Sequence, residues 1–256
     1  MSGRLPLINL IALLITVAVN FFANTATVNG ETIGAISARY PTLITPAPYA
    51  FGIWIFIYLM LGAFTVSHLG RAPKRRMEVM QVGWWFLASC AANCGWIFAW
   101  LYGLTGLSVL LMITQLCCLL RIVQRTEMEM TDALPDTVVL LWWPFCIYLG
   151  WIVFATVVNI AIWLVKIGWT GWGITASAGT IILIVVAGVA YLCLTWLRNM
   201  RESGLVGVWA LVTVAVANRS RAPIVSTVAW GMAAVLFFSS MIHAYRNRKL
   251  APFRKR

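Results

Sequence analysis

Most of this chain consists of apolar stretches without a charged residue, and that feature limits its possible folds more than any other. A membrane-spanning helix needs about 20 predominantly apolar residues. Stretches near that length lie at 5–26, 49–68, 82–102, 104–120, 138–164, 176–197, 204–217 and 225–243. The sequence therefore predicts an all-α, polytopic membrane helix bundle with about eight transmembrane helices.

Composition excludes a soluble domain, because 62% of the residues are hydrophobic and only 10% are charged. A soluble domain has about 25% charged residues. The net charge of +12 is carried by short loops and the C-terminal tail, so we expect no nucleic-acid partner. Charges at membrane depth usually mark ion pathways, and their absence from the predicted spans argues against an ion-coupled transporter.

Loop charge bears on the short segment 204–217, which could cross the membrane or be re-entrant. With eight crossings, most of the 19 lysines and arginines lie on the side of the two termini. The positive-inside rule then places both termini in the cytoplasm. Without a crossing at 204–217 the tail changes sides and the bias disappears. We therefore expect an integral protein of the inner or plasma membrane, with 5–26 retained as a helix and not cleaved as a signal peptide.

The cysteines and histidines give no sign of a metal or haem site. All six cysteines lie in apolar stretches, without zinc-ligand or haem-attachment spacing, and this favours packing roles. His68 and His243 lie at the ends of predicted spans, where we expect interfacial residues. No nucleotide-binding motif or catalytic triad is present. We therefore expect no metal site and no catalytic residue.

Three predicted spans carry aromatic and amide side chains along one helical face. Trp54 and Tyr58 form an i, i+4 pair in the second span. The other two stripes are Asn93, Trp96 and Trp100 in the third span, and Tyr148, Trp151, Phe154 and Asn159 in the fifth. A buried indole N–H needs a partner, which a buried amide can supply. Such stripes suit either ordinary helix packing or the walls of a pocket for a flat, largely apolar ligand.

The order and spacing of these residues resemble the tryptophan-rich sensory protein family, also called the translocator or TspO/MBR family. That family has a proline-containing loop, then a Trp-x3-Tyr pair matched by Trp54 and Tyr58, and an Asn-x2-Trp element matched by Asn93 and Trp96. Its fifth helix carries Tyr-x2-Trp-x2-Phe-x4-Asn-x3-Trp, which is reproduced here by Tyr148, Trp151, Phe154, Asn159 and Trp163. The resemblance implies a five-helix unit at 1–165. An additional three-helix module with a basic cytoplasmic tail follows at 166–256.

The resemblance implies a sensor or carrier that binds a hydrophobic ligand, either a porphyrin or other tetrapyrrole or a sterol-like molecule. The ligand site that it implies consists of Tyr49, Trp54, Tyr58, Asn93, Trp96, Tyr148, Trp151, Phe154 and Asn159. No cofactor is required, and porphyrin or haem is the tetrapyrrole that such a site would hold. Tyr49 is the nearest match to a tryptophan usually found before the second helix, so the loop over the ligand is expected to differ.

Two other functions stay open on the sequence alone. One is a permease that moves a small metabolite without ion coupling, using the three extra helices. The other is an enzyme that degrades porphyrins in light. The expected partners are membrane lipid and a hydrophobic small molecule, and a homodimer is one possible assembly.

Overall fold

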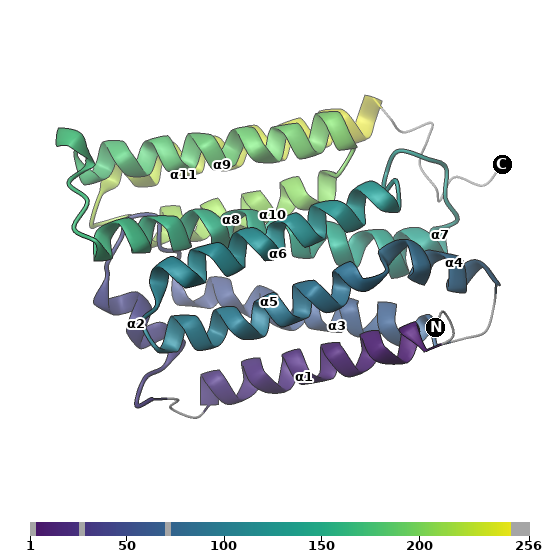
Figure 1. The fold of residues 1–256 in the computed structure, drawn as a ribbon. Helices are drawn as coiled ribbons and strands as arrows, with labels where there is room; N and C mark the ends of the chain where they lie inside the picture. The colour runs from purple at the N-terminus through teal and green to yellow at the C-terminus, as the bar shows by residue number, and fades with distance from the viewer. Residues whose placement is uncertain (1–3, 26–28, 70–72, 247–256) are drawn as a thin grey trace.

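The computed structural model describes residues 4–25, 29–69 and 73–246, with the side chains of 73–76 left undescribed. The long elements of the described chain are all helices, and they run back and forth along one direction (Figure 1). The elements are α1 (Leu5–Thr25), α2 (Ile33–Arg39), η1 (Pro48–Gly52), α3 (Ile53–Ser67), α4 (Pro73–Val82), α5 (Trp84–Leu101), α6 (Thr105–Arg125), α7 (Pro135–Thr137), η2 (Val138–Trp142), α8 (Trp143–Lys166), η3 (Gly171–Gly173), α9 (Ala176–Arg198), α10 (Arg201–Ala217) and α11 (Pro223–Arg246). The predicted all-α membrane helix bundle is confirmed.

Seven helical segments in the described chain are long and apolar enough to cross a membrane. The segment that falls short is α10, whose 17 residues span only about 25 Å. It nevertheless runs through the bundle antiparallel to α9 and α11 and packs against both (Figure 1). As a result α1 begins and α11 ends at the same end of the bundle (Figure 1). This arrangement agrees with the eight crossings that the sequence predicts.

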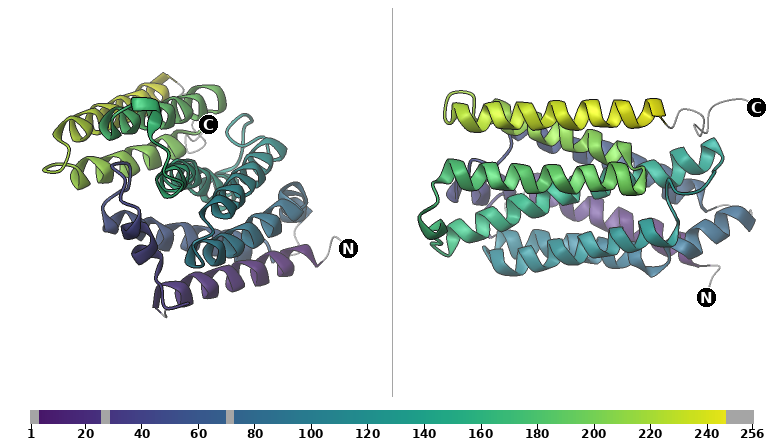
Figure 2. Two further views of the ribbon diagram at one scale, coloured as in Figure 1. Left: turned by 60° about the vertical axis from the view of Figure 1, so that its left-hand side comes forward. Right: turned by 90° about the horizontal axis from the view of Figure 1, so that it is seen from above.

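The helix α8 lies in the middle of the bundle. It packs against α3 and α6 on one side and against α9 and α10 on the other (Figure 2). A helix surrounded in this way must be apolar on all faces, and α8 buries most of its side chains, among them Phe145, Trp151 and Ile152. Helices of both predicted units, 1–165 and 166–256, therefore pack against α8.

Two glycines set how closely helices approach. Gly150 on α8 faces Ser203 on α10, and a Cβ atom at Gly150 would lie 3.0 Å from the Ser203 Cα. Gly207 faces Tyr191 of α9, and a Cβ atom there would come within 2.5 Å of the tyrosine ring. Small residues of this kind let membrane helices pack tightly in the absence of a hydrophobic driving force.

The connection between α5 and α6 is a tight hairpin. Gly103 adopts the left-handed conformation, with φ at +67°, and its N–H donates to Trp100 O over 2.9 Å. Glycine tolerates this conformation at a helix end because it has no Cβ atom. The short connection lets α6 begin at Thr105 directly after α5 ends at Leu101.

The close contact between α9 and α10 yields a stability prediction. We expect Gly207→Ala to lower the free energy of unfolding by about 1–3 kcal/mol, because the added methyl group overlaps the fully buried ring of Tyr191. Unfolding in detergent micelles, followed by circular dichroism, measures the change. The matched control is Gly179→Ala on α9, where a Cβ atom meets open space. Equal destabilisation in the two variants would contradict the packing argument.

Candidate functional site

An aromatic cluster joins α3 to α8. The Trp54 ring stacks on Tyr58, with ring centroids 5.3 Å apart, and meets Tyr148 and Trp151 edge-to-face at 6.0 and 6.4 Å. The Phe154 ring lies 5.9 Å from Trp151. The stripe on α8 and the pair on α3 therefore meet, and the structure brings together five of the nine predicted site residues.

The rings on α8 are packed as interior residues. Tyr148, Trp151 and Phe154 are at most 2% exposed, whereas Trp54 and Tyr58 are partly buried at the edge of the core. Phe51 of η1 covers Trp151 edge-to-face at 5.9 Å and is itself 43% exposed. The cluster thus has a closed side on α8 and a more open side on η1 and α3.

The segment η1 is tied to α10 by hydrogen bonds. The Trp209 indole N–H donates to Ala50 O over 3.2 Å, and the Ala47 N–H donates to Thr213 O over 3.2 Å. Tyr49 belongs to this contact, because its ring meets Trp209 at 5.8 Å and is 51% exposed. Tyr49 therefore lies beside α10 and makes no ring contact with the aromatic cluster. Its sequence position gave no signal of this, because Trp209 is far away in the chain.

Buried polar side chains join α6 to the aromatic cluster and α1 to α5. The Gln115 amide on α6 donates to the Tyr148 hydroxyl, and Asn20 on α1 donates to Asn93 Oδ1 on α5 over 2.8 Å. Three atoms of this set have no hydrogen-bond partner among the described residues: Tyr58 OH, Asn93 Nδ2 and Gln115 Oε1. A buried polar atom without a partner is uncommon and calls for an explanation.

Trp96 and Asn159 form a separate contact between α5 and α8. The Trp96 indole N–H donates to Asn159 Oδ1 over 3.0 Å, and the Ser108 hydroxyl of α6 donates to the same oxygen over 3.1 Å. The Asn159 amide nitrogen donates to Ala155 O over 3.1 Å. Asn159 is thus occupied by contacts within the protein that hold three helices together, which corresponds to the helix-packing alternative.

A groove of about 430 Å³ opens at the α5–α6 hairpin. Its lining residues are Gly103, Leu104, Thr105, Gly106, Leu107, Trp163, Lys166 and Ile167. None of the nine predicted site residues borders it. The Lys166 ammonium group donates a hydrogen bond to the Gly103 carbonyl oxygen there. This contact ties the end of α8 to the α5–α6 hairpin. This groove and the aromatic cluster are different places in the bundle.

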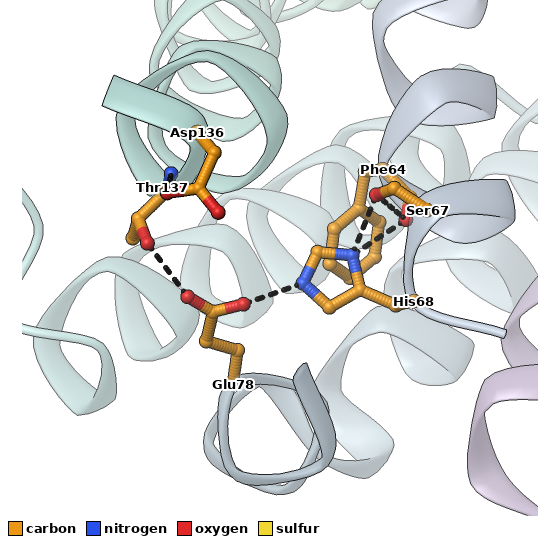
Figure 3. Close-up of polar contacts among 6 residues, drawn as sticks. All are labelled: Phe64, Ser67, His68, Glu78, Asp136 and Thr137. Carbon is orange, nitrogen blue, oxygen red and sulfur yellow. Dashed lines mark hydrogen bonds and ion pairs between the residues drawn. The ribbon is translucent and has the colours of Figure 1, made fainter. Parts of the chain in front are cut away.

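A buried pair between His68 and Glu78 was not anticipated from the sequence (Figure 3). The His68 imidazole Nε2 lies 2.9 Å from Glu78 Oε2, and the Thr137 hydroxyl donates to Glu78 Oε1 over 2.8 Å. His68 is 1% exposed and Glu78 is 5% exposed. The pair links α3, α4 and α7 at one end of the bundle. Glu78 follows His68 by ten residues in a basic segment, a pattern too weak to predict a contact.

The two histidines therefore differ from the interfacial residues expected. His243 of α11 is 3% exposed and lies within 3.0 Å of Asn199 Oδ1, which caps α9 in a left-handed conformation. Each imidazole has a polar partner near a helix end, Glu78 of α4 for His68 and Asn199 at the end of α9 for His243. Helix ends alone do not show which of them will be covered in this way.

Replacing Glu78 tests the importance of the buried pair. We expect Glu78→Ala to lower the free energy of unfolding by about 1–3 kcal/mol, because His68 and Thr137 lose a buried partner. Thermal unfolding in detergent measures the effect. Asp132→Ala, at an exposed loop position, is the control and should change stability little. A Glu78→Ala protein as stable as the control would show that the pair contributes nothing.

Comparison with known proteins agrees with this architecture. A family model described as TSPO-like protein matches residues 6–242, a region that extends from α1 through most of α11. Comparisons with curated proteins and with solved structures find no match. The family match covers most of the chain and includes the helices after residue 165. This integral membrane helix bundle therefore belongs to the TSPO-like protein family.

Proposed function

We propose that this protein binds a flat, hydrophobic ligand of the tetrapyrrole or sterol-like class between α1, α3, α5, α6 and α8, and acts as a sensor or carrier. The observation that carries the proposal is the aromatic cluster together with three unpartnered buried polar atoms on α3, α5 and α6: Tyr58 OH, Asn93 Nδ2 and Gln115 Oε1. Aromatic walls with a few polar groups are typical of small-molecule pockets.

The unpartnered atoms also describe the polar edge of the ligand. Asn93 Nδ2 needs an acceptor, Gln115 Oε1 needs a donor, and the Tyr58 hydroxyl can take either role. Each buried polar atom without a partner costs about 1–3 kcal/mol, and a ligand that supplies the partner recovers that cost. A ligand with a neutral hydroxyl, ketone or pyrrole N–H fits these needs.

Charge favours a neutral edge at this site. The residues that form the aromatic cluster and its polar border carry no basic side chain. Burying a carboxylate without a cation is costly. Any carboxylates of a bound porphyrin should therefore point out of the cluster, toward a water-facing end of the bundle.

Entry of the ligand requires movement at the open side of the cluster. Phe51 and Trp54 lie over the buried Trp151, and η1 is held in place by Trp209 and Thr213 of α10. Displacing these two rings would open a path from the lipid side. Under this proposal α10 controls how readily η1 moves, so the C-terminal helices take part in ligand access.

The Tyr58 hydroxyl offers a test that leaves the helix packing intact. We expect Tyr58→Phe to weaken ligand binding about tenfold, because one hydrogen bond worth about 1.4 kcal/mol is lost. The stability of the ligand-free protein should not fall and should rise if the hydroxyl is unsatisfied there, since it has no partner among the described residues. Quenching of tryptophan fluorescence on titration with protoporphyrin, haem and cholesterol measures the affinity.

Tyr102→Phe is the control, because Tyr102 is 58% exposed at the end of α5. Equal affinity of both variants and the unmodified protein for every probe would contradict the site assignment. No quenching in the unmodified protein would contradict ligand binding of this class altogether. Loss of porphyrin absorbance that requires both the protein and light would point instead to an enzyme that degrades it.

A further inference from the structure

Three metal-ligating side chains converge at the end of the bundle where α6 ends and α8 and α10 begin. They are Glu129 in the loop after α6, Cys146 on the first turns of α8, and Glu202 in the first turn of α10. Their ligand atoms all lie within 4.8 Å of one another. The three residues are far apart in sequence, so only the fold brings them together.

The cluster is largely buried, and some of its polar atoms lack hydrogen-bond partners among the described residues. The Cys146 side chain is completely buried, and its thiol forms no hydrogen bond among the described residues. One oxygen of each carboxylate, Glu129 Oε1 and Glu202 Oε2, is hidden from solvent and likewise lacks a hydrogen-bond partner there. Buried carboxylates are normally paired or coordinate a metal. The thiol and one oxygen of each carboxylate therefore lack hydrogen-bond partners in the described chain, at a place where the three side chains converge.

The backbone around the cluster is held by hydrogen bonds that do not use the ligand atoms. Asn199, in a left-handed conformation, donates to Glu129 O over 2.8 Å. The Ser203 hydroxyl donates to Cys146 O over 2.6 Å and joins α10 to α8. Glu129 itself has φ at +60°, a conformation that is uncommon for a residue with a side chain. The loop and the two helices are thus positioned independently of any ion.

Two arginines near the cluster, Arg198 and Arg201, do not close it by forming ion pairs. Neither Arg198 nor Arg201 lies within ion-pair distance of the two carboxylates in the described chain. No arginine side chain of the described chain therefore occupies the carboxylates of the cluster through an ion pair.

We propose that Glu129, Cys146 and Glu202 bind a divalent zinc ion, with a fourth coordination position open to water. Zinc is bound in proteins by cysteine sulfur and carboxylate oxygen, and three protein ligands with one open position are typical of its non-structural sites. A thiolate ligand selects against magnesium and calcium, which prefer oxygen. The ion would join the loop after α6 to α8 and α10. This site is separate from the aromatic cluster on α3 and α8.

Cobalt substitution tests the proposal through the sulfur ligand. The purified full-length chain in detergent is titrated with Co²⁺, and Zn²⁺ is then added in competition. We expect a thiolate-to-cobalt charge-transfer band that saturates at one ion per chain and disappears when Zn²⁺ displaces the cobalt. Cys146→Ser should abolish the band, whereas Cys193→Ser, at an exposed position on α9, should leave it unchanged.

The carboxylates are tested by variants that conserve size. Glu129→Gln and Glu202→Gln should each weaken Zn²⁺ binding at least tenfold, since even outer-shell changes cost about 10–100-fold. Glu127→Gln, at an exposed position two residues away, is the matched control. Absence of the charge-transfer band in the unmodified chain would overturn the proposal. So would equal Zn²⁺ affinity in the Glu129, Glu202 and Glu127 variants, and these two results remain decisive even if Cys146→Ser does not fold.

Discussion

Polar groups inside this bundle need partners in their own helix, on another helix or on a ligand, because the bilayer core supplies no water. The central helix α8 shows how the fold meets this constraint. Its Gly150 carbonyl oxygen accepts from Tyr191 of α9 over 2.8 Å, and its Cys146 carbonyl oxygen accepts from Ser203 of α10. Asn159 and Tyr148 receive hydrogen bonds from α5 and α6. Helices on both sides of α8 are therefore fixed in register by polar contacts to one element.

The same contacts bear on the division at residue 165, which stays a prediction from the sequence. The C-terminal helices pack on α8, and α10 also holds η1 through Trp209 and Thr213. The segment that covers the aromatic cluster is thus anchored to a helix outside the predicted five-helix unit. Under the proposed function, changes in α10 would alter ligand access without touching the ligand.

Two places with different chemistry contain buried polar atoms without hydrogen-bond partners among the described residues. The interior set, with Tyr58, Asn93 and Gln115, is neutral and borders aromatic rings, which suits an uncharged polar edge on an apolar ligand. The set at the bundle end, with Glu129, Cys146 and Glu202, offers a sulfur and carboxylate oxygens, which are ligands of zinc. The His68–Glu78–Thr137 contact shows the opposite case, because its polar atoms satisfy one another. Whether a buried group is partnered thus separates places that can hold a ligand from places that stabilise the fold.

The sequence by itself determined the class of fold, the approximate spans and the helical stripes, because these depend on local composition and on a 3.6-residue period. It also anticipated that Trp54 and Tyr58 would meet the stripe of Tyr148, Trp151 and Phe154, through the family pattern. Only the tertiary structure decided that Trp96 and Asn159 satisfy each other, that Tyr49 lies against Trp209, and that His68 is buried with Glu78. It alone brought Cys146, which the sequence had suggested only as a packing residue, beside two glutamates from other segments. The physical reason is that burial and hydrogen-bond partnership arise between helices distant in sequence, and no local pattern encodes which of their faces will meet.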